Sequence, residues 1–313
     1  MNNIVITTII PTHNRRECLE RAILSVLRQR QSNINPHTNT SNNNHYNNLW
    51  VIDDASSDGT AELVRSLACD SLSCDSLSYD KLHFHRINAS SPKGVSYARN
   101  LGVKLSASNH QHDEWIAFLD SDDEWRPDKL KHCCQYIQQH PEINILHSDE
   151  IWIRNGVRVN PMKKHQKLGG EIFAECLPLC RIGPSAVMIR RSLFEKAGGF
   201  REDFPVCEDY ELWLRITAHH PVGYIDQPLI VKYGGHPDQL SRRFKAMDYW
   251  RIKALYLLLN GERELRKLKE EHRALAAQEI SRRAAWLLQG YKKHGNLEKY
   301  EEVEEMLRFA QAQ

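Results

Sequence analysis

Short apolar runs alternate with amphipathic segments along the first part of the chain. Residues 4–10 form an apolar, β-branched run of the kind found in strands that are buried on both faces. From Leu19 to Leu27 the apolar residues recur at helical spacing, so an amphipathic helix is expected after this strand. The same order of strand, polar turn and helix recurs, with further strands expected at residues 49–53, 82–87 and 115–119.

This alternation predicts an α/β fold with a mixed, mainly parallel sheet flanked by helices. Open sheets of this kind bind ligands at the carboxyl ends of their strands. The polar turns after the first, second and fourth strands are therefore expected to meet in one crevice. From about residue 141 to residue 243, strand-like runs mix with glycine-rich turns, which favours an extension of the sheet that covers the crevice.

Three other stretches differ from this pattern. Residues 31–48 are almost wholly polar, and residues 69–80 include a tandem Cys-Asp-Ser-Leu-Ser repeat, so both are interpreted as surface insertions without chemistry. Residues 244–313 contain no proline and combine alternating charges with apolar positions at helical spacing, which predicts a helical C-terminal extension. We expect a main domain over residues 1–243 and the extension over residues 244–313.

Charge and composition exclude several classes of protein. The 313 residues include 42 Lys plus Arg and 40 Asp plus Glu, so no uniformly basic field marks a nucleic-acid partner. No apolar run approaches the ~20 residues of a membrane-spanning helix, and the first residues show neither the basic segment nor the long apolar stretch typical of a secretory signal, so none is expected. The expected location is the cytoplasm, with association at the inner face of the membrane left open. The scattered cysteines fit reduced thiols, and Cys176 and Cys180 lack a second pair at zinc spacing.

An acidic turn at residues 120–123 is the strongest chemical signal. Asp120, Asp122 and Asp123 follow a buried strand, where like charges repel unless a cation compensates them. Carboxylate oxygens suit Mg²⁺ or Mn²⁺, which proteins hold together with the oxygens of a substrate diphosphate. A solvated acidic turn that caps the next helix explains the same residues equally well.

A second acidic turn follows the second strand. A carboxylate at Asp53 or Asp54 can accept the N–H of a nucleotide base or the hydroxyls of its ribose. The alternative is an Asx-turn with a helix N-cap, to which Ser57 and Asp58 are suited. The chain has neither a Gly-x-Gly-x-x-Gly segment nor a P-loop, which argues against a dinucleotide enzyme and a P-loop NTPase.

Five segments taken together resemble glycosyltransferase family 2, a large family of inverting enzymes with the GT-A fold. Each segment alone is a weak signal, but they occur in the family's order over about residues 3–243. They are residues 10–15, 51–60, 94–102, 118–130 and 207–215. The resemblance implies a GT-A domain that binds a nucleoside-diphosphate sugar.

The resemblance also implies a role for each matching residue. Pro11 and Thr12 would line the nucleotide base, Asp54 would bind the base or ribose, and Arg99 would hold the diphosphate side of the donor. A salt bridge on a helix surface is the alternative for Arg99. The implied nucleotide-sugar site comprises Pro11, Thr12, Asn14, Asp54, Arg99, Asp120, Ser121 and Asp122.

The implied metal is Mn²⁺ or Mg²⁺. Asp122 would be the direct ligand, with Asp120 nearer the ribose or bound through water. His236 is a candidate third ligand, although a lone histidine is more often structural, and Arg242 and Arg243 could pair with the diphosphate or with solvent. For Asp123 the alternative is a cap on the next helix.

Asp209 falls where the family keeps its general base, just after Glu208. It would deprotonate the acceptor hydroxyl as that oxygen attacks the anomeric carbon on the face opposite the leaving nucleotide, so that the anomeric configuration inverts. Stabilisation of a helix N-terminus is the alternative for both acids.

The sequence thus predicts a metal-dependent, inverting glycosyltransferase. It would move a sugar from a nucleoside-diphosphate donor, expected to be UDP-linked, to a hydroxyl of a glycan or lipid-linked acceptor in bacterial cell-surface polysaccharide biosynthesis. A catalytically idle domain that binds nucleotide sugars or acts as a scaffold is the alternative, against which the intact Asp122 and Asp209 argue. The helical extension is expected to pack on the core, with pairing of two copies through it or binding of a partner as the alternatives.

Overall fold

A computed structural model describes most of the chain. The described residues are 4–29, 46–69, 82–107, 113–160, 162–235, 244, 246–261 and 267–313. The two expected insertions lie almost entirely outside these ranges.

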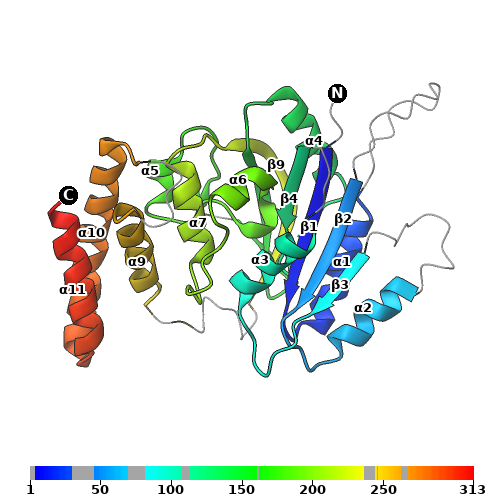
Figure 1. Cartoon of the computed structure of the whole chain (residues 1–313), viewed down its shortest axis with the longest axis horizontal. Coiled ribbons are helices and arrows are strands. Elements are labelled where there is room, and N and C mark those ends of the chain that lie inside the picture. Colours follow the sequence, from blue (N-terminus) through cyan, green and yellow to red (C-terminus); the bar gives the residue numbers. More distant parts are fainter. Residues whose placement is uncertain are drawn as a thin grey trace.

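The N-terminal part of the chain forms the parallel half of a sheet (Figure 1). Its strands pair in the order β3-β2-β1-β4, and they are β1 (Ile4–Thr12), β2 (Tyr46–Asp53), β3 (Leu82–Arg86) and β4 (Asp113–Phe118). The helices that connect them are α1 (Arg16–Leu27), α2 (Thr60–Cys69) and α3 (Val95–Leu105). Every residue of β1 is buried, because α1 and α2 cover the face that carries Ile6 and Ile10 while α3 covers the face that carries Ile9.

The second half of the sheet is mixed and extends from β4. Its strands are β5 (Glu124–Trp125), β6 (Ile145–Arg154), β7 (Val157–Val159), β8 (Met188–Arg190) and β9 (Gly223–Gly234). β8 runs antiparallel to β4 and β6, whereas β9 runs parallel to β6 and antiparallel to β5. In the described part of the chain the strands form one nine-stranded sheet. The expected α/β fold with a mixed sheet flanked by helices is confirmed.

Short helices and turns connect this half of the sheet. They are α4 (Lys129–Gln139), η3 (Lys163–His165), α5 (Phe173–Cys176), η4 (Pro184–Ala186), α6 (Arg191–Lys196) and α7 (Glu208–Thr217). Apolar residues of α4 join the core under α1, and those of α6 and α7 join the core under α3. The start of α7 therefore lies on the same face of the sheet as α3.

Three described helices end the chain, at the side of the molecule opposite β2 and β3 (Figure 1). They are α9 (Met247–Leu259), α10 (Glu270–His294) and α11 (Leu297–Gln311). The buried Ile252 and Leu255 of α9 belong to the same apolar core as Trp213 of α7. The C-terminal helices therefore pack on the core, as one interpretation of the sequence expected.

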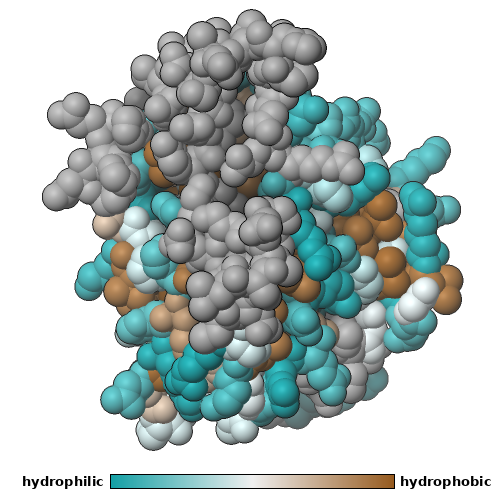
Figure 2. Space-filling model, turned by 90° about the vertical axis from the view of Figure 1, so that its right-hand side faces the viewer, coloured by the Kyte–Doolittle hydropathy of each residue, from teal (hydrophilic) through white to brown (hydrophobic). Residues whose placement is uncertain are grey.

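The surface of the described residues shows no dominant apolar face in the view of Figure 2, which looks at the side that carries β2, β3 and α2. Hydrophobic groups there lie in separate patches among hydrophilic ones. Among the helices that the structure describes, none combines the length and apolar character needed to cross a membrane.

Candidate active site

A pocket of about 720 Å³ opens at the carboxyl ends of the parallel strands. It brings together every site residue that the sequence predicts within the described ranges, which are Pro11, Thr12, Asn14, Asp54, Arg99, Asp120, Ser121, Asp122 and Asp209. These residues come from the ends of β1, β2 and β4, from α3 and from the start of α7. The expected crevice is thus present. His236, Arg242 and Arg243 lie outside the described residues.

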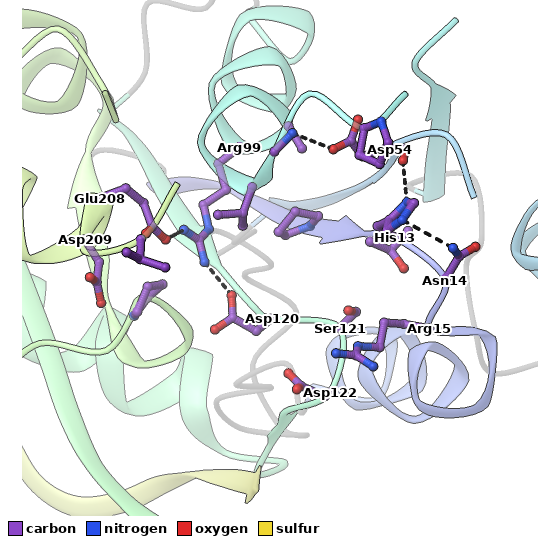
Figure 3. Close-up of a pocket in the computed structure, with 18 of the residues that line it drawn as sticks. His13, Asn14, Arg15, Asp54, Arg99, Asp120, Ser121, Asp122, Glu208 and Asp209 are labelled. Carbon is purple, nitrogen blue, oxygen red and sulfur yellow. Dashed lines mark hydrogen bonds and ion pairs between the residues drawn. The ribbon is translucent and has the colours of Figure 1, made fainter. Parts of the chain in front are cut away.

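The pocket has two walls with an acidic turn between them (Figure 3). His13, Asn14 and Asp54 lie on one side, and we call this part the nucleotide wall after the role that the family resemblance implies for it. Glu208 and Asp209 lie on the other side, at the start of α7. The turn of Asp120, Ser121 and Asp122 lies between the two walls.

Asp54 organises the nucleotide wall. Its two carboxylate oxygens accept the backbone N–H groups of Lys93 at 2.8 Å and Gly94 at 2.7 Å, just before α3 begins. Its carbonyl oxygen lies 2.7 Å from Nδ1 of His13. Asp54 therefore ties the ends of β1 and β2 to the start of α3, and its carboxylate still lines the pocket.

Asn14 joins two turns of the nucleotide wall. Its backbone N–H donates to Oγ of Ser56 at 2.9 Å, and its side-chain oxygen accepts the N–H of Ser57 at 2.8 Å. Asn14 has a φ of 51°, a left-handed conformation that asparagine tolerates better than most residues. Asp58 forms an Asx-turn just before α2, because its Oδ1 accepts the N–H of Thr60 at 3.1 Å. The Asx-turn part of the alternative therefore describes Asp58, whereas Asp54 lines the pocket.

Ser185 holds the acidic turn in place through two hydrogen bonds. Its hydroxyl oxygen accepts the N–H of Asp120 at 3.1 Å and donates to Oδ2 of Asp123 at 2.6 Å. The other carboxylate oxygen of Asp123 accepts the N–H of Tyr233 at 3.2 Å. Burial raises the pKa of Asp123 to about 8. The interpretation of Asp123 as a helix cap is wrong, because its side chain points into the fold and α4 begins only at Lys129.

The remaining acids of the turn fit a divalent cation. The pKa of Asp122 is raised because burial and the negative charge of Asp120 both penalise its ionised form, while Arg15 opposes the shift. A cation would remove this penalty, and Mg²⁺ or Mn²⁺ commonly takes one or two carboxylates plus substrate phosphates. No group of three metal-ligating side chains gathers within the described ranges.

Arg99 lies under the pocket with 3% of its side chain exposed. Its Nη2 donates to Oδ1 of Asp120 at 2.6 Å, and its Nη1 donates to Oε1 of Glu208 at 2.8 Å. Both ends of the guanidinium thus face protein carboxylates (Figure 3). The ion pairs are buried rather than on a helix surface, and they connect α3, the acidic turn and α7.

Asp209 faces the pocket from the first turn of α7. Its Oδ1 accepts the N–H of Tyr210 at 2.7 Å, and its Oδ2 accepts the thiol of Cys180 at 3.4 Å. Burial and the charge of Asp209 raise the pKa of Glu208 to about 7, and Arg99 opposes this shift. The two acids at the start of α7 thus have different surroundings. Glu208 is paired with the guanidinium of Arg99, whereas Asp209 is open to the pocket.

Sequence reasoning missed three residues of this site. Ser185 falls in the irregular stretch of residues 141–243, Cys180 stands out only as a metal candidate, and Lys232 belongs to none of the motifs. Lys232 lies on β9 and lines the pocket. The sequence offers one sign of this residue, because a lysine directly follows the apolar run of residues 228–231.

The sequence matches the family described as Glycosyl transferase family 2 over residues 7–198. An uncharacterized glycosyltransferase of Rickettsia conorii is 29% identical over 231 residues, which cover 73% of this chain and 33% of that protein. The Escherichia coli protein named UDP-Glc:alpha-D-GlcNAc-diphosphoundecaprenol beta-1,3-glucosyltransferase WfgD is 27% identical over 226 residues, covering 72% and 75% of the two chains. The chain spans about a third of the length of its Rickettsia relatives.

Two solved structures have a similar fold. S. aureus TarS 1-349 in complex with UDP-GlcNAc has a TM-score of 0.59 at 16% identity, covering 97% of this chain and 91% of that one. The mannosyltransferase PcManGT from Pyrobaculum calidifontis in complex with GDP-Man and Mn²⁺ has a TM-score of 0.50 at 16% identity, covering 97% and 83%. These likenesses confirm the GT-A fold that the sequence predicts.

Proposed function

Since the chain belongs to glycosyl transferase family 2, we propose that its pocket moves a sugar from a UDP-linked donor to a hydroxyl of a glycan or lipid-linked acceptor, with inversion at the anomeric carbon. The observation that carries the proposal is that Asp122, on the acidic turn, and Asp209, on the wall formed by α7, line one pocket from separate places (Figure 3). An inverting transfer needs this separation, because the leaving group and the attacking oxygen occupy opposite faces of the sugar.

The nucleotide wall would hold the base and ribose of the donor. Pro11 and Thr12 line the pocket at the end of β1, and the carboxylate of Asp54 lies beside them at the end of β2. The oxygens of Asp54 that accept backbone N–H groups retain lone pairs for a base N–H or a ribose hydroxyl. Asn14 shapes this wall through its bonds to the neighbouring turn.

Asp122 and Asp120 would hold Mn²⁺ or Mg²⁺, which when bound supplies neutralising charge to the donor diphosphate. Arg99 acts as a positioning residue in this account, because it fixes Asp120 and Glu208 through its two ion pairs. Of the two acids at the start of α7, Glu208 is held by Arg99, and Asp209 is the one that would face the acceptor.

Asp209 would act as the general base. It accepts the proton of the acceptor hydroxyl while that oxygen forms a bond to the anomeric carbon. The bond from the anomeric carbon to the phosphate oxygen breaks in the same step, and the nucleoside diphosphate leaves with the electron pair. The bonds from Tyr210 and Cys180 hold the carboxylate of Asp209 in place for this transfer.

The relatives support the donor class and the setting. WfgD is by its name a UDP-Glc transferase acting on a diphosphoundecaprenol-linked sugar, and TarS was solved with UDP-GlcNAc. A further relative, TuaG of Bacillus subtilis, is named as a teichuronic acid biosynthesis glycosyltransferase. We therefore place the proposed reaction in bacterial cell-surface polysaccharide biosynthesis.

A donor panel tests this function. The purified chain is incubated with UDP-sugars and GDP-sugars, with Mn²⁺, Mg²⁺ or a chelator, and with or without diphosphoundecaprenol-linked acceptors. We expect nucleoside diphosphate to be released from a UDP-sugar, faster with acceptor and only with a divalent cation. The product linkage, read by NMR, should be β from an α-linked donor. Binding of UDP with metal but no turnover of any donor would support the idle-domain alternative.

A further inference from the structure

Lys232 lines the pocket but has no part in the reaction described above. It shares the pocket lining with Asp120 of the acidic turn and with Asp209 of α7. The charges of both acids act on its ammonium group. Lys232 therefore lies within electrostatic range of the turn that would hold the diphosphate and of the carboxylate that would face the acceptor. The transferred sugar has to occupy the space between these two groups.

Glu150 lies near Lys232, on the neighbouring strand β6. β6 and β9 are paired in parallel, and the Nζ of Lys232 and the Oε2 of Glu150 lie 3.3 and 3.4 Å from the point where a Cβ on Gly183 would be. The two side chains thus converge over a residue that has no side chain of its own. The other oxygen of Glu150 is occupied, since it accepts Nε1 of Trp152 at 2.7 Å and lies 3.1 Å from Nζ of Lys167.

The ammonium of Lys232 has hydrogen-bond donors to spare. Within the described residues it makes no hydrogen bond and no ion pair within 4 Å, although an ammonium carries three donors. Burial opposes its charged form, but the carboxylates around it, Glu150 first among them, outweigh burial and raise the pKa of Lys232. A charged, partly buried donor group that faces a pocket without an acceptor is suited to bind a ligand oxygen.

The surroundings of Lys232 also select the charge of that ligand. Four carboxyl groups around the ammonium already compensate its charge, so a further carboxylate, such as that of a uronic acid, would meet like charges. A neutral hexose or N-acetylhexosamine offers hydroxyl and carbonyl oxygens as acceptors without adding charge. The balance of charge therefore favours a neutral sugar.

We propose that Lys232 binds the transferred sugar of the donor, donating hydrogen bonds to oxygens of a neutral hexose or N-acetylhexosamine, and so determines donor specificity. The inference rests on the proposed function, because it assigns the sugar end of the donor whose nucleotide end lies on the nucleotide wall. Its distinguishing consequence is that Lys232 contributes to the binding of a UDP-sugar and not to the binding of UDP.

Calorimetric titration of UDP and of the UDP-sugar that the panel identifies, both with Mn²⁺, tests this inference. Wild type is compared with Lys232→Met and with Lys232→Gln, which keeps a neutral donor. Lys167→Met is the matched control, because Lys167 pairs with Glu150 but does not line the pocket. We expect Lys232→Met to bind UDP within about twofold of wild type and the UDP-sugar about tenfold more weakly, a loss on the scale of one charged hydrogen bond.

Three results would overturn the assignment of Lys232 to the transferred sugar. Equal loss of UDP and UDP-sugar affinity in Lys232→Met and Lys232→Gln would assign the lysine to the diphosphate. Unchanged affinity for both ligands would assign it to the fold alone, and tighter binding of a UDP-uronic acid than of neutral UDP-sugars by wild type would contradict the charge argument. Wild type that binds no nucleotide sugar at all would instead contradict the proposed function.

Discussion

The Nη1 of Arg99 donates a hydrogen bond of 2.8 Å to Oε1 of Glu208, and both side chains are buried. The two residues are 109 positions apart and belong to α3 and α7. The other end of the guanidinium pairs with Asp120. One cation thus connects the turn that would hold the metal to the helix that carries the proposed base.

Removal of this cation should damage both stability and turnover. In Arg99→Met the buried carboxylate of Glu208 and the partly exposed carboxylate of Asp120 lose their partner, so we expect the free energy of unfolding to fall by about 3 kcal/mol. Urea unfolding measures this loss, and donor turnover should fall by at least about 100-fold because Asp120 and Glu208 lose their common anchor. The exposed pair of Arg65 and Glu62 is the control, and Arg65→Met should cost less than about 1 kcal/mol. Equal effects of the two substitutions would contradict this role.

Gly102 determines how closely α3 approaches the sheet. A Cβ at this position would lie 2.6 Å from Cγ2 of Ile9 and 3.1 Å from Cγ1 of Ile52. Gly102→Ala should therefore destabilise the fold by about 1–3 kcal/mol and lower turnover, because it displaces the helix that carries Arg99. Gly290→Ala on α10 meets nothing within 4 Å and should stabilise by up to about 1 kcal/mol. Thermal unfolding of both variants measures these opposite effects on stability. A Gly102→Ala variant that is more stable than wild type would contradict this role of Gly102.

The thiol of Cys180 is expected to support Asp209. Burial, and then the charge of Asp209, raise the pKa of Cys180 well above its ordinary value, so the group stays a protonated donor at neutral pH. Cys180→Ser retains a donor and should keep kcat within a few-fold, whereas Cys180→Val should lower kcat about tenfold with unchanged affinity for UDP. Equal kcat for the serine and valine variants would show that the hydrogen bond has no part in catalysis.

His147 should make the fold sensitive to acid. Its side chain is fully buried on β6, where one ring nitrogen lies 2.7 Å from the carbonyl oxygen of Leu168, and burial together with Lys167 lowers its pKa to about 4. The unfolded chain binds this proton near pH 6.5, so the stability from the neutral ring is present above that pH and is lost as the pH falls toward 4.

Urea unfolding at two pH values measures this effect. Between pH 7 and pH 5 the contribution of His147 amounts to about 2 kcal/mol. His147→Gln should be less stable than wild type at pH 7, but its loss of stability on going to pH 5 should be smaller by that amount. The same pH dependence in both proteins would contradict the assignment.

Much of the architecture could be predicted because its signals are local. The apolar run that became β1 and the helical spacing from Leu19 to Leu27 each report burial within one element. The turn residues Asp54 and Asp122 follow their strands directly, and parallel pairing then brings them to one edge. Nothing in these inferences requires knowledge of distant contacts.

What could not be predicted depends on residues far apart in sequence. Ser185 reaches Asp120 across 65 positions, and Arg99 reaches Glu208 across 109. Asp123 points away from the pocket, unlike its neighbours, because its carboxylate accepts hydrogen bonds from the hydroxyl of Ser185 and the backbone N–H of Tyr233. The pattern of acids in the turn is the same whichever of them faces the pocket, so only tertiary packing separates the ligand candidates from the structural acid.

The most direct test of the account separates donor binding from transfer in two isosteric variants. Asp122→Asn removes the proposed metal ligand, and Asp209→Asn removes the proposed base while keeping an oxygen for the N–H of Tyr210. UDP binding with Mn²⁺ and sugar transfer are measured on the same preparations. We expect Asp122→Asn to lose metal-dependent UDP binding, and Asp209→Asn to bind UDP as wild type does while its turnover falls by about 100-fold or more. Near wild-type turnover in Asp209→Asn, or unchanged metal-dependent binding in Asp122→Asn, would contradict the assignment of these two carboxylates.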